Sequence, residues 1–138
     1  MRILGIDFGE SRIGVAVSDP LGLTAQGLDT IKWDGRIMIP AERIKQLAAQ
    51  YQVEKIVIGL PKNMNGTIGE SGKRAIEFGN LLEEITGLEV VKWDERLTTV
   101  SANRIMHETG MKTSKKKDAV DKIAAVLILQ GYLDSRVK

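Results

Sequence analysis

The sequence predicts an α/β fold with a five-stranded mixed sheet and helices on both faces, in the order β-β-β-α-β-α-β-α-α. Two short apolar segments near the N-terminus are joined by a Gly-containing stretch, a pattern typical of a hairpin. Farther along, apolar strand-like segments alternate with segments of helical periodicity, which indicates βα units. The final segment contains AAVLIL, which is apolar around most of a helix circumference and should therefore lie against the sheet.

The first half of the chain predicts three strands and one helix. Pro40 suits the first turn of a helix, and the apolar residues that follow it recur at helical spacing up to Tyr51. This pattern predicts a helix over about 40–52. The three expected strands are residues 2–7, 13–18 and a segment within 24–33.

The second half predicts two strands and three helices. The strand over 54–60 has an uninterrupted apolar centre, which suits a strand covered on both faces. A Gly- and Asn-rich loop follows it. The remaining elements are a helix over about 71–86 that ends at Gly87, a strand over 88–94, a helix from Thr98 or Thr99 to Thr109 that Gly110 stops, and a last helix over about 118–134.

This order predicts an antiparallel meander followed by strands that run parallel to the first. Ligands of such sheets bind beyond the carboxyl ends of the parallel strands. Three polar clusters occupy those ends here, namely Asp7, the loop over 61–66, and Asp94 with Glu95. We therefore expect these clusters to converge on one edge of the sheet.

The length and composition of the chain exclude several classes of protein. The 138 residues suit a single domain over 1–138. The absence of cysteine excludes disulfide scaffolds and thiolate zinc sites, and the single histidine, His107, excludes a site with several histidine ligands. The N-terminus carries acidic residues in place of an apolar signal region, and no apolar run is long enough to span a membrane. We expect a cytoplasmic protein without a membrane partner.

The formal net charge is +2, and the basic excess lies near the C-terminus. Much of it comes from four lysines for which we expect a mobile loop ahead of the last helix. Such a run is either a solvated loop or a nucleic-acid contact, and its sequence does not decide between the two. The four residues are Lys112, Lys115, Lys116 and Lys117.

The candidate metal-binding side chains are all carboxylates. Asp7, Glu95 and one of Asp118 and Asp121 would form an oxygen-only site, which suits Mg²⁺ or Mn²⁺. Two such ions can clamp both oxygens of an in-line phosphodiester displacement. Because Asp118 and Asp121 share a helix face, spacing alone does not choose between them.

Each of these acids also has an ordinary structural explanation. Asp7 could end a strand in an Asx-turn, Asp121 could pair with Lys117, and Glu95 could be a loop acid. Their joint position at one sheet edge favours a functional site.

The loop over 62–67 leads into a helix whose free amides could hold a phosphate, although a plain Asn-Gly turn with a helix cap fits equally well. The segment fails the P-loop pattern twice, with Thr67 in place of the first Gly and Arg74 in place of Ser or Thr. This argues against an NTPase.

Four segments resemble the motifs of the bacterial YqgF/RuvX family. They are DFGESRIGVAVSD (7–19), VIGLPKNMNGT (57–67), KWDERLTT (92–99) and KKKDAVDKIAAVLILQGYL (115–133). The resemblance implies a ribonuclease-H-like fold related to the RuvC resolvase. Members of the family are described as Holliday junction resolvases and as nucleases that mature the 5′ end of pre-16S ribosomal RNA.

The resemblance also implies roles for individual residues. It makes Asp7, Glu95 and Asp121 the catalytic residues and metal ligands, and gives Asp118 a supporting role. Phosphate or site support would come from Arg12, Asn63, Arg96 and Thr98. Independently of the resemblance, we expect basic side chains around the loop after the fourth strand and in the C-terminal run to contact nucleic acid, namely Lys62, Lys73, Lys112, Lys115, Lys116 and Lys117.

The implied enzyme is a nuclease of the two-metal type, a hydrolase acting on ester bonds in structured RNA or branched DNA. Processing of the 5′ end of pre-16S ribosomal RNA is the favoured reaction, and resolution of Holliday junctions is the alternative. A non-catalytic nucleic-acid-binding protein remains a third reading, and the sequence is compatible with a homodimer. A phosphotransferase of the actin and sugar-kinase type also opens with D-x-G, but it needs a second domain that this length does not provide.

Overall fold

The computed structural model describes residues 1–94 and 113–136, and the side chains of 1–94 and 122–136. Its sheet has five strands in the order β3-β2-β1-β4-β5. β2 is antiparallel to both β1 and β3, whereas β4 is parallel to both β1 and β5. The described elements are β1 (Arg2–Phe8), β2 (Arg12–Ser18), β3 (Ala25–Lys32), α1 (Met38–Gln50), β4 (Val53–Leu60), α2 (Glu70–Thr86), β5 (Glu89–Asp94) and α4 (Thr113–Arg136).

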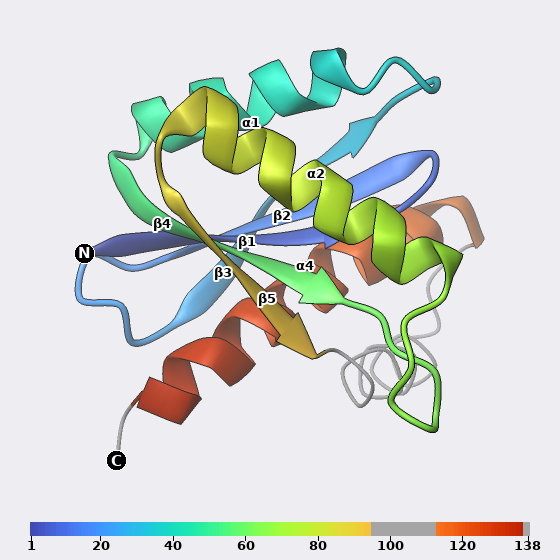
Figure 1. Ribbon diagram of the computed structural model, residues 1–138. Coiled ribbons are helices and arrows are strands. Elements are labelled where there is room, and N and C mark those ends of the chain that lie inside the picture. Colours follow the sequence, from blue (N-terminus) through green and yellow to red (C-terminus); the bar gives the residue numbers. More distant parts are fainter. Residues whose placement is uncertain (95–112, 137–138) are drawn as a thin grey trace.

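The five expected strands and their directions are confirmed. So is the placement of helices on both faces, since α1 and α2 cover one face of the sheet and α4 crosses the other (Figure 1). The helix expected to end at Thr109 lies outside the described residues. None of the described helices is long and apolar enough to cross a membrane.

Each face of the sheet has its own apolar core. The core under α1 and α2 contains Ile6, Ile58 and Phe78, whereas the core under α4 contains Val57 and Leu129. β4 contributes side chains to both cores, because successive residues of a strand point to opposite faces. This explains the uninterrupted apolar centre of β4.

A row of small residues lets α4 approach the sheet closely. Gly5 on β1 pairs with Ala16 on β2, which pairs with Gly27 on β3. A Cβ atom added to Gly5 would lie 2.7 Å from Leu129 Cβ and 3.1 Å from the carbonyl oxygen of Ala125. The middle of α4 therefore rests almost directly on the backbone of β1.

The C-terminal half of α4 is fastened to β4 and β5 by aromatic and polar contacts. Tyr132 meets Trp93 edge to face, with ring centroids 5.9 Å apart. Lys55 donates a hydrogen bond of 3.1 Å to the Tyr132 hydroxyl, and this bond raises the pKa of Lys55, with a smaller contribution from Glu89. These contacts fix the helix at the end far from Asp118 and Asp121.

The predicted helix ends hold except at the start of α4. α2 ends at Gly87 with a φ of 72°, as its glycine stop predicts. α1 begins at Met38, so that Pro40 lies in its first turn. α4, however, begins at Thr113, five residues before the predicted start.

The expectation of a loop ahead of the last helix was therefore wrong for Lys115, Lys116 and Lys117, which lie within α4. Lysine is a good helix former, and a helix that packs strongly downstream can extend through residues that have no apolar contact. Lys112 lies outside the described residues.

The close approach of α4 predicts different effects for two glycine substitutions. Gly5→Ala should lower the free energy of unfolding by about 1–3 kcal/mol, because the new methyl group would overlap α4. Gly27→Ala is the matched control, since its Cβ would meet only the flexible side chain of Lys122 at 3.5 Å and should change stability by less than about 0.5 kcal/mol. Urea unfolding of both variants measures the difference, and equal losses would contradict this account of α4 packing.

Candidate active site

The carboxyl ends of β1, β4 and β5 lie at one edge of the sheet. The register shows this directly, because Ile6 pairs with Ile58 and Leu60 pairs with Asp94. The loop after β4, the start of α2 and the start of α4 lie at the same edge (Figure 1). This is the edge at which the sequence predicted a site.

Asp7 lies at this edge and faces α4. Its neighbours Ile6 and Phe8 both pack into the core under α1 and α2, so alternation puts Asp7 on the opposite face with Gly5. The Asp7 side chain is half-buried, and Asp7 pairs with Gly14 inside the β1–β2 ladder. Asp7 is therefore a residue of the strand itself, which sets aside its explanation as a turn residue.

Asp94 lies at the same edge but on the other face of the sheet. Trp93 belongs to the core under α4, so alternation points Asp94 towards the side of α1 and α2. The three clusters thus lie at one edge of the sheet, as expected. Asp7 and Asp94, however, are on opposite faces of the sheet. Glu95, the next residue, lies outside the described residues.

Two cations share the face of Asp7. Arg12 begins β2 and pairs with Lys32 at the end of β3. Arg12 lies two residues from Gly14 on β2, and Gly14 pairs with Asp7. Arg12 and its partner Lys32 therefore point to the same face of the sheet as Asp7. Like charges directly opposite each other on a sheet destabilise it, so this pair suits the binding of an anion.

Sequence reasoning found Arg12 and missed Lys32. The strand β3 carries a register shift opposite Val15 and Ala16, which changes the face of every residue after it. No signal in the sequence marks that shift. The side chain of Lys32 is exposed, and its ammonium group forms no hydrogen bond or ion pair with any residue in the part of the chain that the structure describes.

The turn between β1 and β2 is held from the core side. Trp33 Nε1 donates a 2.9 Å hydrogen bond to the carbonyl oxygen of Gly9. The Phe8 ring lies between the rings of Trp33 and Phe78, with centroid distances of 5.6 and 4.6 Å. These contacts fix the backbone between Asp7 and Arg12.

The loop between β4 and α2 is braced by its own hydrogen bonds. The amide N–H groups of Asn63 and Gly66 donate to the carbonyl oxygens of Thr67 and Asn63, each at 2.8 Å. Asn65 Oδ1 accepts from both the backbone N–H and the hydroxyl of Thr67, at 3.1 and 2.7 Å. The Asn-Gly turn is thus confirmed, with Gly66 at a φ of 86°.

Asn63 supports this loop directly. Its side-chain Nδ2 donates a 2.9 Å hydrogen bond to Thr67 Oγ1, so its described polar contact is internal to the loop. Two roles were expected for Asn63, namely support of the site and binding of phosphate. The hydrogen bond to Thr67 is consistent with support of the loop, and phosphate binding stays a prediction.

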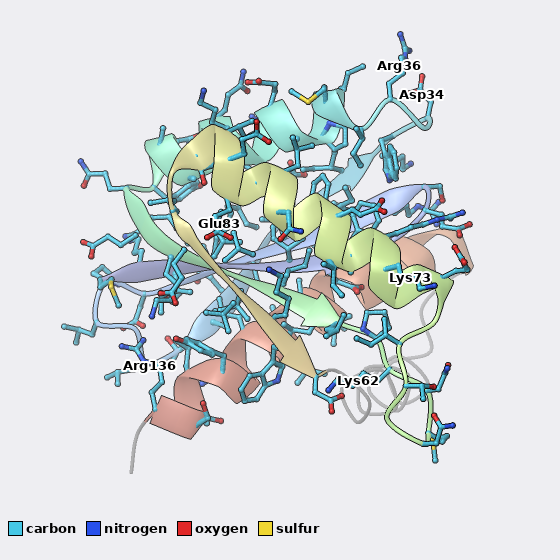
Figure 2. The ribbon with its side chains drawn as sticks, in the orientation of Figure 1. Asp34, Arg36, Lys62, Lys73, Glu83 and Arg136 are labelled. Carbon is cyan, nitrogen blue, oxygen red and sulfur yellow. The ribbon has the colours of Figure 1, made fainter. Side chains whose placement is uncertain are left out.

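The predicted cations of this region gather around the loop. Lys62 is half-buried next to the end of β4, and Lys73 is exposed in the first turn of α2 (Figure 2). Arg74 pairs with Glu10 of the β1–β2 turn, a contact that sequence reasoning missed. The side-chain ammonium groups of Lys62 and Lys73 form no hydrogen bond or ion pair within the described part of the chain, and both residues stand at the candidate edge.

Several predicted site residues cannot be placed by their side chains. Glu95, Arg96, Thr98 and Lys112 lie outside the described residues, and Asp118, Asp121 and the three lysines of α4 are described by backbone alone. Among the described side chains, no group of three or more His, Cys, Asp or Glu could hold a metal ion. Asp7 is the described member of the expected set, and its oxygen ligands fit Mg²⁺ or Mn²⁺.

The chain matches known proteins along almost its whole length. The model of the family described as "RuvX: Holliday junction resolvase" matches residues 1–135. A protein of Acetivibrio thermocellus named "Putative pre-16S rRNA nuclease" is 59% identical over 139 residues, covering 100% of this chain and 99% of the relative. A protein of the same name from Clostridium botulinum is 56% identical over 134 residues, covering 97% of each.

Solved structures show the same fold at low sequence identity. Thermus thermophilus RuvC in complex with a Holliday junction substrate superimposes with a TM-score of 0.63 at 15% identity, covering 99% of this chain and 96% of the other. Fowlpox virus resolvase with Holliday junction DNA superimposes with a TM-score of 0.57 at 13% identity, covering 100% of each chain. Both comparisons confirm the ribonuclease-H-like fold.

Proposed function

The chain belongs to the RuvX family, and we propose that it is a metal-dependent nuclease that processes the 5′ end of pre-16S ribosomal RNA. The observation that carries the proposal is the 59% identity, over the full chain, to a relative named for that activity. The half-buried Asp7 at the carboxyl edge of the sheet supplies a suitable acid for it. Family membership also disfavours the phosphotransferase reading.

We assign the metal to Asp7, Glu95 and Asp121, with Mg²⁺ or Mn²⁺ as the ion and two ions as the expected number. Glu95 directly follows Asp94, the last residue of β5, in the sequence. Position 121 is one helical turn before Ala125, whose carbonyl oxygen lies over Gly5. The end of β5 and the N-terminal part of α4 thus lie at the same edge of the sheet as Asp7 (Figure 1).

Bound divalent ions would supply an activated water and charge stabilisation at the phosphate under attack. The protein's own contribution would be to hold Asp7 on β1 and position 121 on α4, with Asp118 supporting the set from the same helix. Arg12 and Lys32 face the same side as Asp7 and can neutralise a neighbouring phosphate. We assign Arg96 and Thr98 to site support by their motif positions.

The second candidate function is resolution of Holliday junctions. The description of the matching family model favours it, and two structures of the same fold contain junction DNA. A manganese-dependent cleavage assay on a four-way DNA junction, linear duplex DNA and precursor ribosomal RNA separates the candidates. Selective cleavage of the precursor near the mature 5′ end supports the proposal, and selective cleavage of the junction contradicts it.

Three further expectations accompany the proposal. They are a single domain over 1–138, a cytoplasmic location and a chain compatible with a homodimer. Each stays a prediction.

Loss of any one ligand should abolish cleavage and leave nucleic-acid binding nearly intact. Asp7→Asn, Glu95→Gln and Asp121→Asn remove metal ligands without removing phosphate-neutralising cations. Asp118→Asn is the control within the same helix and should have the milder effect. Cleavage rates and affinities measured on the same substrate test this, and a fully active ligand variant would remove that residue from the mechanism.

Divalent metal should stabilise the folded protein. Three carboxylates gathered without a cation repel one another, and a bound ion relieves that cost. Millimolar Mn²⁺ should therefore raise the melting temperature of the wild type, and raise it less for Asp7→Asn. Thermal unfolding with and without metal measures both shifts. Equal shifts would argue against metal binding at Asp7.

The proposed phosphate contacts predict a change in salt dependence. Each lost contact should flatten the slope of log affinity against log salt by about 0.7 to 0.9. We expect this loss for Lys32→Ala, and a larger one when Lys112, Lys115, Lys116 and Lys117 are all replaced by alanine. Lys45→Ala, an exposed lysine on α1, is the control and should leave the slope unchanged. An unchanged slope in the quadruple variant would show that the lysine run is only a solvated surface.

A further inference from the structure

Met64 is an apolar side chain held out into solvent at the candidate edge. It is 95% exposed, the most exposed of the large hydrophobic residues in the described part of the chain. We propose that Met64 packs against an unpaired nucleobase of the substrate and so selects nucleic acid with unpaired bases near the cleavage site. This inference rests on the proposed function, because it takes the ligand to be nucleic acid.

The loop presents Met64 on a firm base. Hydrogen bonds join the residues on either side of it, because Asn63 donates to Thr67 from its backbone N–H and its side chain, and the Gly66 N–H donates to the Asn63 carbonyl oxygen. Below them, a Cβ atom on Gly72 would lie 2.5 Å from Ile68 Cγ2 and 2.8 Å from the Pro61 carbonyl oxygen, so the stem of the loop lies tightly on α2. Because the backbone of this loop is already braced, binding would not have to order the loop, which favours a contact role for Met64.

The surroundings of Met64 favour nucleic acid as the occupant. The segment 61–74 carries three cations, Lys62, Lys73 and Arg74, against the single acid Glu70. Of the cations, Arg74 is paired with Glu10, whereas Lys62 and Lys73 form no ion pair with a described residue. An apolar tip between cations matches a ligand that offers a flat apolar base next to phosphates.

The position of the loop sets the reach of the contact. Met64 is four residues beyond the end of β4, and four extended residues span at most about 13 Å. Because the loop turns back on itself, this is an upper limit, and at about 3.4 Å of rise per nucleotide it corresponds to at most about four stacked nucleotides from the strand end. Methionine is flexible and polarisable, and it is among the apolar side chains that insert between bases.

The base must be unpaired for this contact to form cheaply. Bases inside a continuous duplex are stacked on both sides, and opening a step costs free energy, whereas a bulge or branch already exposes a base face. Met64 would therefore add affinity for bulged or branched substrates and little for continuous duplex. This difference separates its role from that of the lysines, which act on both.

The test compares two RNA probes that differ only by an unpaired bulge. Binding is measured by fluorescence anisotropy in EDTA, so that cleavage does not interfere. Met64→Ala should weaken binding of the bulged probe about fivefold, near the lower end of the loss seen when an aromatic stacking partner is removed. It should leave the continuous duplex unchanged. Met64→Phe should restore the preference for the bulge, because an aromatic ring stacks on a base at least as well.

Leu21→Ala is the matched control. Leu21 is 77% exposed in the turn between β2 and β3, at the opposite end of the sheet from Asp7, and its loss should change neither probe. Melting temperatures should stay at the wild-type value for all three variants. Equal affinity of wild type and Met64→Ala for the bulged probe overturns the inference while leaving the nuclease proposal standing. If the wild type binds neither probe and cleaves no nucleic acid, both proposals fall.

Discussion

The close approach of α4 to the sheet is the constraint on which the rest of the structure depends. At Gly5 the helix lies so near to β1 that a single methyl group has no room. The proposed chemistry needs an acid from a strand and an acid from a helix at one place, and a helix held off by larger side chains would keep them apart. Gly5 would therefore serve the proposed site without facing a substrate, because it sets the distance between β1 and α4.

The two faces of the sheet carry different kinds of side chain near the candidate site. On the side of α1 and α2, Phe8, Trp33 and Phe78 build an apolar cluster that also holds the β1–β2 turn. On the side of α4, the same strands carry Asp7 and Arg12 at their ends. Strand alternation makes this possible, since adjacent residues of one strand belong to different environments. Packing on one face thereby fixes the polar residues on the other.

Much of the fold could be predicted from the sequence, because local patterns carry it. The apolar centre of β4, the Asn-Gly turn and the stop at Gly87 each have a local cause. The failures are non-local or cooperative. Lys32 joins the site through a register shift between two strands, and α4 extends through its lysines because its distant residues pack well. The opposite faces of Asp7 and Asp94 follow from counting along two strands whose pairing only the structure supplies.

The alternation at the end of β5 has a consequence for how this sequence can change over time. Trp93 and Asp94 occupy opposite sides of the sheet, so the insertion or deletion of one residue in β5 would exchange the sides of every residue after it. Trp93 would lose its contact with Tyr132 in the same event. The length of β5 is therefore constrained more tightly than the identity of its exposed residue Glu89, whose replacement moves no other residue to the opposite face.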